Sequence, residues 1–268
     1  MTNELPKLSD EVEDLDPRRS MIAAIVGLTL TLLALVALWE FLARWSGIPS
    51  WLLPAPSAIV ESMIEWRGEL TWHFMVTLYE VLVGFALSIV VSIPLAVAVV
   101  YSPFLQNTIY PILLALQSTP KVAIAPLLVL WIGFGALPKI LVVFLVCFFP
   151  IVVATASGLS SVPPALIDLI RSLSATSTQT FIKIRFPTAI PHIFVGLKIA
   201  ITFAVIGGVI GEFVGSDEGL GYLILISTSQ SRTPLAFGAL LLLTIMSIVL
   251  YYAVEFIERL VVPWAPRN

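Results

Sequence analysis

The sequence predicts an all-α membrane protein with six transmembrane helices, and two features of its composition support this prediction. Of the 268 residues, 59% are apolar and only 12% are charged, whereas soluble globular domains carry about 45–50% apolar and about 25% charged residues. Runs without Asp, Glu, Lys or Arg reach the roughly 20 residues that a spanning helix needs; the longest are 20–39, 81–120, 140–167 and 233–254. This composition excludes a water-soluble enzyme, a disordered chain and a nucleic-acid-binding protein.

The first helix is expected at residues 21–43, after an acidic tail at residues 1–20. The tail is not typical of a cleavable signal peptide, because it is acidic and no small-residue cleavage site follows a short apolar region. We therefore expect the first span to be an uncleaved membrane anchor and the tail to be solvated.

The second helix is expected at residues 74–100 and ends where the run 81–120 must break. As one straight helix that run would be about 60 Å long at about 1.5 Å per residue. Pro103 provides the break, since proline removes a helix donor and pushes the preceding residue out of the helical region.

The third helix is expected at residues 106–134, although it contains three prolines and the polar run 117–121. Irregular backbone at membrane depth is tolerated only where protein or water surrounds it, and a lysine there is costly. Two interpretations stay open: the polar run lines a solute pathway, or it is a packing kink from which Lys121 extends to the interface.

The last three helices are expected at residues 138–158, 193–215 and 233–257. In the fifth helix Lys198 and Glu212 are 14 residues apart, about 21 Å along a helix, so both cannot lie outside a hydrocarbon layer about 30 Å thick. Lys198 can extend to one membrane surface, which leaves Glu212 inside the layer. Glu212 has either a pathway role or a structural role as a hydrogen-bonded acid.

The distribution of Lys and Arg predicts that both termini are cytoplasmic, because cations are enriched on that side. With this orientation four cations lie in outer segments, namely Arg44, Arg67, Lys139 and Arg232. Nine lie on the cytoplasmic side: Lys7, Arg18, Arg19, Arg171, Lys183, Arg185, Lys198, Arg259 and Arg267.

An outer segment at residues 49–66 is expected to contain a short amphipathic helix with Ser57 as its N-cap. Trp51 and Trp66 suit a membrane interface. The helix either lies on the membrane surface or forms a docking platform for an external partner.

A cytoplasmic segment at residues 160–191 is expected to form a helix, a corner and a second helix. The first helix covers 165–173 with Leu166, Leu169, Ile170 and Leu173 as its apolar stripe, the corner follows at 174–176, and the second helix covers 177–185 and is stopped by Pro187. Such an insertion is costly to order unless something binds it, so we expect it to be a docking element.

This segment resembles the cytoplasmic signature of permeases from binding-protein-dependent ATP-binding-cassette (ABC) importers. That signature is Glu-Ala-Ala, three residues, Gly, nine residues, Ile, any residue, Leu, Pro. Its spacing is kept here by Asp168, Leu169, Ile170, Ser174, Ile184, Phe186 and Pro187. Ser replaces the corner glycine, and a positive φ is costly for Ser.

Further stretches resemble the nitrate, sulfonate and taurine branch of these permeases, over residues 50–262. They are 53–57, Thr77-Leu78, Gly84-Phe85, 120–127, 131–135 with Lys139, 196–198 and 219–222. The resemblance implies a type I (MetI-like) permease core in one domain, residues 21–262, with a coupling segment at residues 160–187 and a short cytoplasmic tail at residues 263–268.

The resemblance implies that the coupling segment docks in a cleft of an ABC ATPase subunit. The residues expected to bear on that ATPase are Asp168, Arg171, Ser174, Ile184 and Pro187. Those expected in the translocation pathway are Gln117, Ser118, Lys121 and Glu212.

The expected partners are two ATPase subunits, a soluble solute-binding protein, a second permease copy in a homodimer and membrane lipid, with no nucleic acid. The chain contains no Gly-x-x-x-x-Gly-Lys-Ser/Thr phosphate loop. ATP and Mg²⁺ would therefore bind to the partner ATPase, and we expect no cofactor in this chain. The resemblance implies import of a small anionic or vitamin-precursor-like solute across a bacterial inner membrane.

The sequence leaves one other class of function open and disfavours another. An ion-gradient-driven secondary transporter or channel would use Glu212 and Lys121 as its ion or proton groups. An intramembrane enzyme is disfavoured, because His73 and His192 are expected in interfacial or loop positions and no His-Glu-x-x-His pair occurs. The one cysteine, Cys147, excludes a disulfide framework and a cysteine-clustered metal site, and we expect no metal site.

Overall fold

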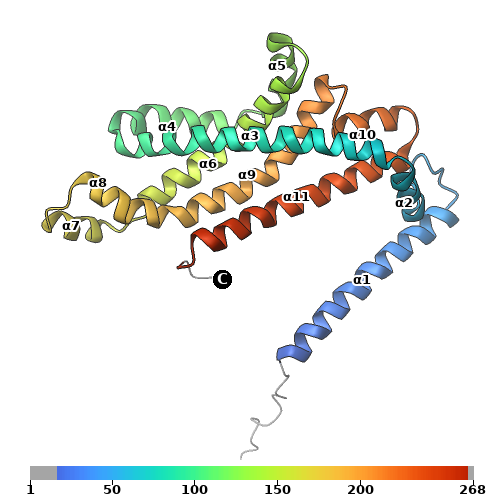
Figure 1. The fold of residues 1–268 in the computed structure, drawn as a ribbon, viewed down its shortest axis with the longest axis horizontal. Coiled ribbons are helices and arrows are strands. Elements are labelled where there is room, and N and C mark those ends of the chain that lie inside the picture. The colour runs from blue at the N-terminus through green and yellow to red at the C-terminus, as the bar shows by residue number, and fades with distance from the viewer. Residues whose placement is uncertain (1–16, 265–268) are drawn as a thin grey trace, which may run out of the picture.

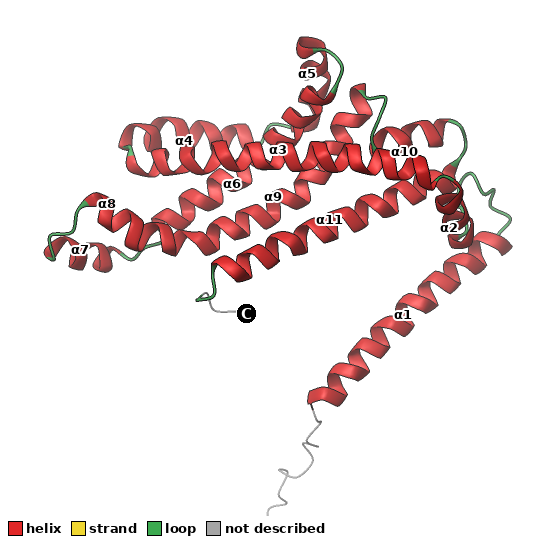
Figure 2. Cartoon of the chain, in the orientation of Figure 1, coloured by secondary structure: helices red, strands yellow, loops and turns green. Residues whose placement is uncertain are grey.

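The computed structural model describes the backbone of residues 17–264 and the side chains of residues 26–264. Residues 1–16 of the predicted acidic tail and residues 265–268 of the predicted C-terminal tail lie outside this range. Every regular element in the described part is a helix (Figure 2). Five helices are long and apolar enough to cross a membrane: α1 (Pro17–Trp45), α3 (Arg67–Tyr101), α6 (Ala136–Ser160), α9 (Phe186–Gly215) and α11 (Thr233–Val261).

The long axis of the molecule separates two groups of short helices (Figure 1). At one end lie α7 (Pro164–Ser172) and α8 (Ser177–Thr180), and we call this the α7 end. At the other lie α2 (Pro56–Glu65) and α10 (Leu220–Ser229), and we call this the α2 end. The long helices α3, α9 and α11 connect the two ends.

Helix α6 is the centre of the core and packs most extensively against α9 and α3. Glycines on the neighbours allow this close approach: a Cβ on Gly84 of α3 would lie 2.6 Å from the Val143 side chain, and one on Gly196 of α9 would lie 2.6 Å from Ala154 Cβ. Small residues are the usual means by which membrane helices bring their backbones together. The facing residues of α6, such as Val143 and Ile151, are fully buried.

The predicted break at residues 101–103 is confirmed, since α3 ends at Tyr101 and Ser102 has extended backbone. The prediction of one helix at residues 106–134 is wrong. The chain forms α4 (Pro103–Gln117), a 3₁₀ turn η1 (Lys121–Ile124) and α5 (Ala125–Ile132), and the two halves are bent by 89°. Pro120 takes an extended conformation at the bend, because its ring cannot continue the helix that ends at Gln117.

Helix α9 begins earlier than residue 193, and Pro187 does not stop the helix before it. Helix α8, a π turn at Phe181–Arg185 and α9 follow one another without interruption. In a π turn each N–H bonds five residues back, as the Phe186 N–H does to the Phe181 carbonyl. Pro187, which has no N–H to donate, lies directly after this π turn, within the continuous helix.

Several elements differ from the prediction at the α2 end. Helix α3 begins at Arg67 rather than near residue 74, and α10 was not predicted because its ten residues are too few for a span. His73 lies in the second turn of α3 and His192 in the second turn of α9, so neither is in a loop; an interfacial position stays a prediction for both.

Helix α1 diverges from the other helices and contacts α2 at its far end (Figure 1). Ser57 is not the N-cap of α2, which begins after Ala55. Instead the Ser57 backbone N–H and hydroxyl donate to the Glu40 carboxylate of α1, at 3.0 and 2.7 Å. Glu40 thus caps α2 from a different helix, while no residue of the apolar window Val26–Trp45 is buried.

Candidate functional site

The coupling segment protrudes from the α7 end and exposes an apolar face. Of the predicted stripe, Leu169 is 57% and Leu173 is 74% exposed, and Leu166 is exposed as well. Ile167, which was not in the stripe, is the residue that α7 buries against the rest of the protein. Exposed leucines on a short helix are costly in water unless a partner covers them.

The corner of the coupling segment has a left-handed backbone at Ser174, the position where the permease signature has a glycine. Ser174 has φ +60°, and two hydrogen bonds close the corner, from Ser174 N to Arg171 O and from Ala175 N to Ile170 O. A non-glycine residue in this region bears a conformational cost that the surroundings must offset. The next helix supplies rigidity, since Thr176 and Gln179 form a reciprocal capping box at its start.

Asp168 and Arg171 lie on the polar side of α7 and are both 73% exposed. Their side chains approach to 3.7 Å, but an exposed pair of this kind contributes about 0–1 kcal/mol. Both charges are therefore free to pair with another molecule.

Ile184 and Pro187 lie behind the exposed face, in the continuous helix that leads into α9. Next to them Tyr101, the last residue of α3, contacts the Phe181 ring edge-to-face at 5.5 Å and the Arg185 guanidinium at 5.6 Å. A role for Tyr101 was not predicted from the sequence, although an aromatic residue directly before the break at Ser102 indicates a packing position. In the structure, Tyr101 joins the coupling segment to α3.

Three of the predicted pathway residues gather at the bend between α4 and η1. Gln117 and Ser118 are exposed. Lys121 donates to the Gln117 carbonyl at 2.6 Å, and its ammonium lies 4.9 Å from the centroid of the Phe149 ring. A cation at a helix C-terminus satisfies an unpaired carbonyl and opposes the helix dipole.

The fourth predicted pathway residue, Glu212, lies at the α2 end and is only 1% exposed. Its carboxylate accepts hydrogen bonds from the Thr77 hydroxyl at 2.6 Å and from the Gly221 N–H. Thr77 Oγ1 accepts from Leu220 N at 2.8 Å, and His73 Nδ1 accepts from Gly219 N at 2.9 Å. The first amides of α10 are therefore capped by side chains of α3 and α9. In this arrangement Glu212 is a hydrogen-bonded acid, which is the structural one of the two roles considered for it.

A second buried polar group lies beside Glu212 and joins α3 to α6. Lys139 is 4% exposed and forms an ion pair with Glu80, which is 1% exposed. Its ammonium also donates to Ser216 Oγ at 2.9 Å, and Ser216 donates to the Glu218 carbonyl. Lys139 lies in the first turn of α6, near the start of the helix predicted at residues 138–158. Glu80 was missed, although its position directly before the charge-free run at 81–120 was a signal.

The predicted site residues and their partners thus lie in three separate polar regions of the described chain: the coupling segment, the bend at Lys121 and the buried network around Glu212 and Lys139. Among the described residues, no hydrogen bond or ion pair joins Lys121 to Glu212. The roles of Gln117, Ser118, Lys121 and Glu212 in a pathway stay predictions.

Comparisons with known proteins agree with this architecture. The family described as binding-protein-dependent transport system inner membrane component matches residues 88–265. The formylaminopyrimidine transport permease protein ThiX of Halalkalibacterium halodurans is 36% identical over 241 residues, covering 90% of this chain and 96% of that protein. The riboflavin transport system permease protein RibX of Chloroflexus aurantiacus is 35% identical over 243 residues, covering 89% and 90%.

A solved structure shows the same fold. The inward-facing MetNI methionine ABC transporter has a chain that superposes with a TM-score of 0.61 at 23% identity, covering 70% of this chain and 93% of that one. Since the family match covers more than half of the sequence, this chain belongs to the binding-protein-dependent transport system inner membrane components, the multi-pass permease subunits of ABC importers for small solutes.

Proposed function

We propose that this permease moves its solute by ATP-driven alternating access, and that the coupling segment receives the movement of an ABC ATPase. The observation that carries the proposal is the exposed face of α7, where Leu169 and Leu173 lie beside Asp168 and Arg171. Exposed apolar side chains beside exposed charges are typical of a docking surface. The rigid corner at Ser174 and the contact of Phe181 with Tyr101 provide a route from this surface to α9 and α3.

The ATP and Mg²⁺ are held by the partner, in two ATPase copies below a permease homodimer. The face of α4 and α5 supports the second permease copy. Helix α4 buries no residue, and Trp131 and Phe134 are 70% and 84% exposed. Lys121, Gln117 and Ser118 lie at the bend between these helices, so pairing through them would bring the three polar side chains to the twofold axis.

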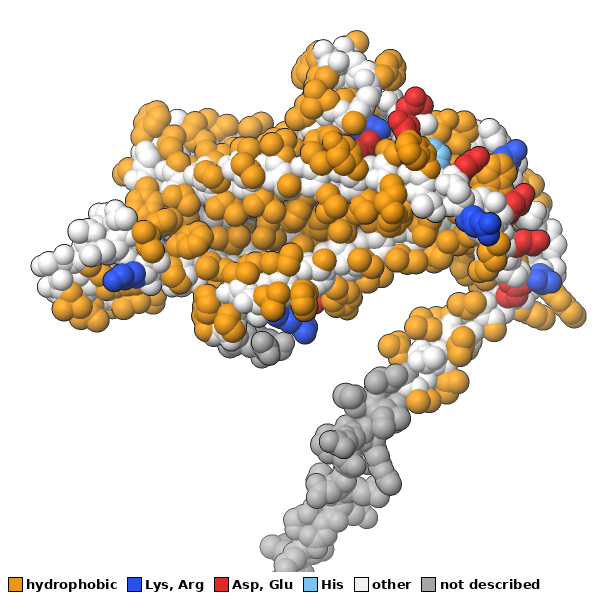
Figure 3. Space-filling model, viewed as in Figure 1, with side chains coloured by type: hydrophobic (Ala, Val, Ile, Leu, Met, Phe, Trp, Pro, Cys, Tyr) orange, Lys and Arg blue, Asp and Glu red, His pale blue; other side chains and the backbone are white. Residues whose placement is uncertain are grey.

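The α7 end faces the cytoplasm of a bacterial cell in this proposal, and the α2 end faces outward. Apolar side chains cover most of the length between the two ends, and charged side chains gather at the α2 end (Figure 3). With this orientation α1 begins and α11 ends on the cytoplasmic side.

The solute is small and anionic or resembles a vitamin precursor. The names of the two relatives, which refer to formylaminopyrimidine and riboflavin, support the second class. Lys121 at the bend would suit an anionic group.

Substitution of Asp168 by Arg tests the coupling role. The reversed charge places a second cation beside Arg171 on α7. A cation of the ATPase that faces Asp168 would then be repelled, and like charges across an interface cost several kcal/mol. We expect ATP hydrolysis stimulated by the binding protein to fall by at least about tenfold, which corresponds to about 1.4 kcal/mol, with unchanged membrane insertion. The measurement is phosphate release by the complex purified from its native membrane, whose subunits are identified by mass spectrometry.

The matched control is Glu255→Arg, which reverses the acid of another surface ion pair, with Arg259 on α11. Equal hydrolysis in wild type and Asp168→Arg would remove the coupling assignment. A chain that purifies without an ATPase, and whose uptake follows a proton gradient after ATP depletion, would instead indicate the gradient-driven carrier. Glu212 and Lys121 are the groups that such a carrier would use for its ion or proton.

A further inference from the structure

A hollow lies where the turn after α5 meets the end of α9 and the loop that leads to α10. Its volume is about 410 Å³, within the range of about 300–1,000 Å³ that small-molecule sites occupy. Phe134 lines it from the turn between α5 and α6, and Leu225 lines it from α10. Phe213 and Asp217 line it from α9 and the loop after α9. The coupling segment contributes no residue to this hollow.

The backbone around Phe134 presents its ring to the hollow. Phe134 lies between two glycines with left-handed backbone, Gly133 at φ +96° and Gly135 at φ +128°, where any side chain would be strained. The Phe134 side chain is 84% exposed. An added Cβ on Gly215 would lie 3.4 Å from Phe134 Cδ1 and 3.0 Å from the Val129 side chain, so a glycine at this position of α9 leaves room for the ring and for α5.

The two aromatic rings of the hollow have surface free for a ligand. Phe213 is 44% exposed and follows the buried Glu212 on α9. Neither Phe134 nor Phe213 takes part in a ring–ring contact with another described aromatic residue. Stacked and edge-to-face arrangements of aromatic rings are favourable beyond the burial of their area. The hollow therefore favours a ligand with a flat ring over an aliphatic ligand of the same size.

The free charge of the hollow is a carboxylate. Asp217 is exposed and forms no ion pair with a described Lys or Arg. Lys139 reaches the wall of the hollow at Ser216 Oγ, 2.9 Å away, but it is buried and pairs with Glu80. A carboxylate accepts hydrogen bonds and repels anions. A ligand beside Asp217 should therefore carry a hydrogen-bond donor or a positive charge, as an amino group does.

Hydrogen bonds hold the loop that carries Asp217. Ser216 Oγ accepts from the Lys139 ammonium and from the Glu218 N–H at 3.2 Å. The Glu218 carboxylate in turn accepts from Trp72 Nε1 of α3 at 3.1 Å. A loop fixed on both sides of Asp217 loses little conformational entropy when a ligand binds.

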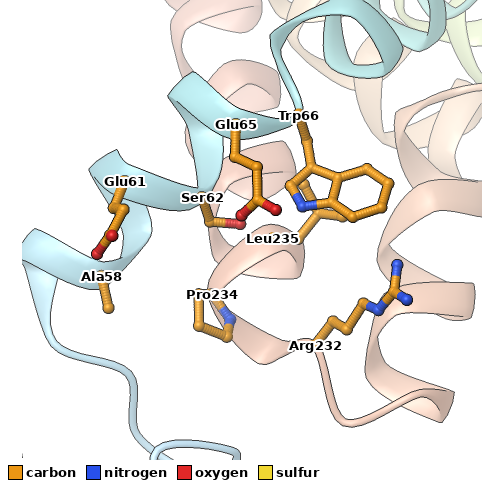
Figure 4. Close-up of a pocket in the computed structure, with 8 residues that line it drawn as sticks. All are labelled: Ala58, Glu61, Ser62, Glu65, Trp66, Arg232, Pro234 and Leu235. Carbon is orange, nitrogen blue, oxygen red and sulfur yellow. The ribbon is translucent and has the colours of Figure 1, made fainter.

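A second hollow, a notch between α2 and the turn from α10 to α11, is different in kind (Figure 4). Glu61 and Glu65 line it from α2, and Trp66 is the one aromatic residue among its eight lining residues. The Arg232 guanidinium lies 4.9 Å from the centroid of the Trp66 ring, so that ring already has a cation as its partner. The notch offers carboxylates without a free ring, and it supplies a matched control.

We infer that the hollow formed by Phe134, Phe213, Asp217 and Leu225 is a binding site for the solute inside the permease, and that the solute carries a flat heteroaromatic ring with an amino group. This rests on the proposed function, in which a second copy pairs through α4 and α5 and encloses the pathway. Charged residues are depleted in the cores of protein interfaces. The free Asp217 therefore favours a solute over the second copy as the group that fills the hollow.

The inference distinguishes between the two solute classes of the proposed function. An anionic solute would be repelled by Asp217, whereas a vitamin precursor with an amino-bearing ring would satisfy both the rings and the carboxylate. Lys121, which would suit an anion, does not line this hollow.

The test is ligand-detected NMR on the complete importer in lipid nanodiscs, with 4-aminopyrimidine and pyrimidine-4-carboxylate as probes. The probes share a ring and differ in the group that would face Asp217. We expect wild type to bind the carboxylate about tenfold more weakly than the amine, because like charges repel across a contact. Asp217→Lys should reverse this preference. The control is Glu61→Lys, which reverses an exposed acid of the notch and should keep the wild-type order.

The rings are tested by substitutions that keep apolar volume. Phe134→Leu and Phe213→Leu should each weaken the binding of 4-aminopyrimidine by about fivefold, since each removes an aromatic contact. Phe256→Leu, which changes an exposed ring of α11 outside the hollow, should bind as wild type does. A diazirine-bearing aminopyrimidine should label the peptide that contains Phe213 and Asp217 in the unsubstituted chain, so the assignment does not depend on the folding of a variant.

Three results would overturn the site. They are equal affinity of wild type for the two probes, labelling confined to peptides outside the hollow, and a photoreactive residue at Leu225 that cross-links to a second copy whether or not 4-aminopyrimidine is present. The proposed function fails separately. It is wrong if no ATPase accompanies the chain, whereas binding of the probes can still be measured on the purified permease. If the complex hydrolyses ATP and the probes do not bind, only the site is wrong.

Discussion

Glu80 and Lys139 form a buried ion pair between α3 and α6, and both are less than 5% exposed. Each would be costly alone at this depth. This pair is not predictable from the sequence alone, because pairing the two residues requires the register of one helix against another. A search for a charge at each end of neighbouring apolar runs could have suggested the pair but not its burial.

Removal of Lys139 alone should be strongly destabilising. Lys139→Met leaves the Glu80 carboxylate buried without its cation, and breaking such a pair costs about 3–5 kcal/mol. The double variant Lys139→Met/Glu80→Gln should recover much of this stability, since no uncompensated charge is left. Thermal unfolding of the detergent-solubilised protein measures both variants, with Arg67→Met as an exposed-cation control.

Equal losses of stability in the single and double variants would show that the ion pair is not the reason for the effect. The stability would then depend on the packing of the Lys139 side chain against Gly211, where an added Cβ would lie 3.2 Å from Lys139 Cβ.

The helices themselves differ in how far the sequence predicts them. The coupling segment follows from local signals, namely apolar spacing and a corner, and the structure keeps its location. Helix α10 depends on tertiary contacts, because its first amides are capped by Thr77, Glu212 and His73, which come from other helices. The approach of α6 to its neighbours also depends on which face each glycine occupies.

Two glycines of α3 provide a matched test of this packing. Gly84→Ala should destabilise the protein by about 1–3 kcal/mol, because the added Cβ would meet Val143 and the Ile140 carbonyl at 2.6–2.8 Å. Gly68→Ala adds the same atom where nothing lies within 4 Å, and alanine favours the helix by about 1 kcal/mol. Unfolding midpoints of the two variants should therefore move in opposite directions; equal midpoints would contradict the close α3–α6 contact.

At the scale of the whole molecule, the sequence predicts the family and the number of spans better than their shape. Apolar runs report that a segment enters the membrane, but they do not report an 89° bend within it. They also do not predict that α1 would diverge from the bundle, with its described apolar side chains largely exposed. The sequence also does not predict the exposed faces of α4 and α5, because a single chain's sequence does not say which surfaces a second copy covers.

A cysteine scan tests the second copy. The one native thiol, Cys147, is fully buried, so an introduced cysteine would be the reactive one. We expect Trp131→Cys on α5 to give disulfide-linked dimers in native membranes under mild oxidation. Tyr252→Cys on α11, which replaces a similarly exposed aromatic residue, should stay monomeric on non-reducing gels. The reverse pattern would place the homodimer interface on α11.

The contact between Tyr101 and Phe181 also has a consequence for the topology of the chain. It brings the end of α3 to the same side as the start of the helix that leads into α9. The bent pair of α4 and α5, together with α6, must therefore make a round trip, and the pair counts as one passage in spite of its bend. With an even number of passages, we expect both ends of the described chain on the α7 side. Reporter tags fused at either terminus should then share one compartment with the ATPase.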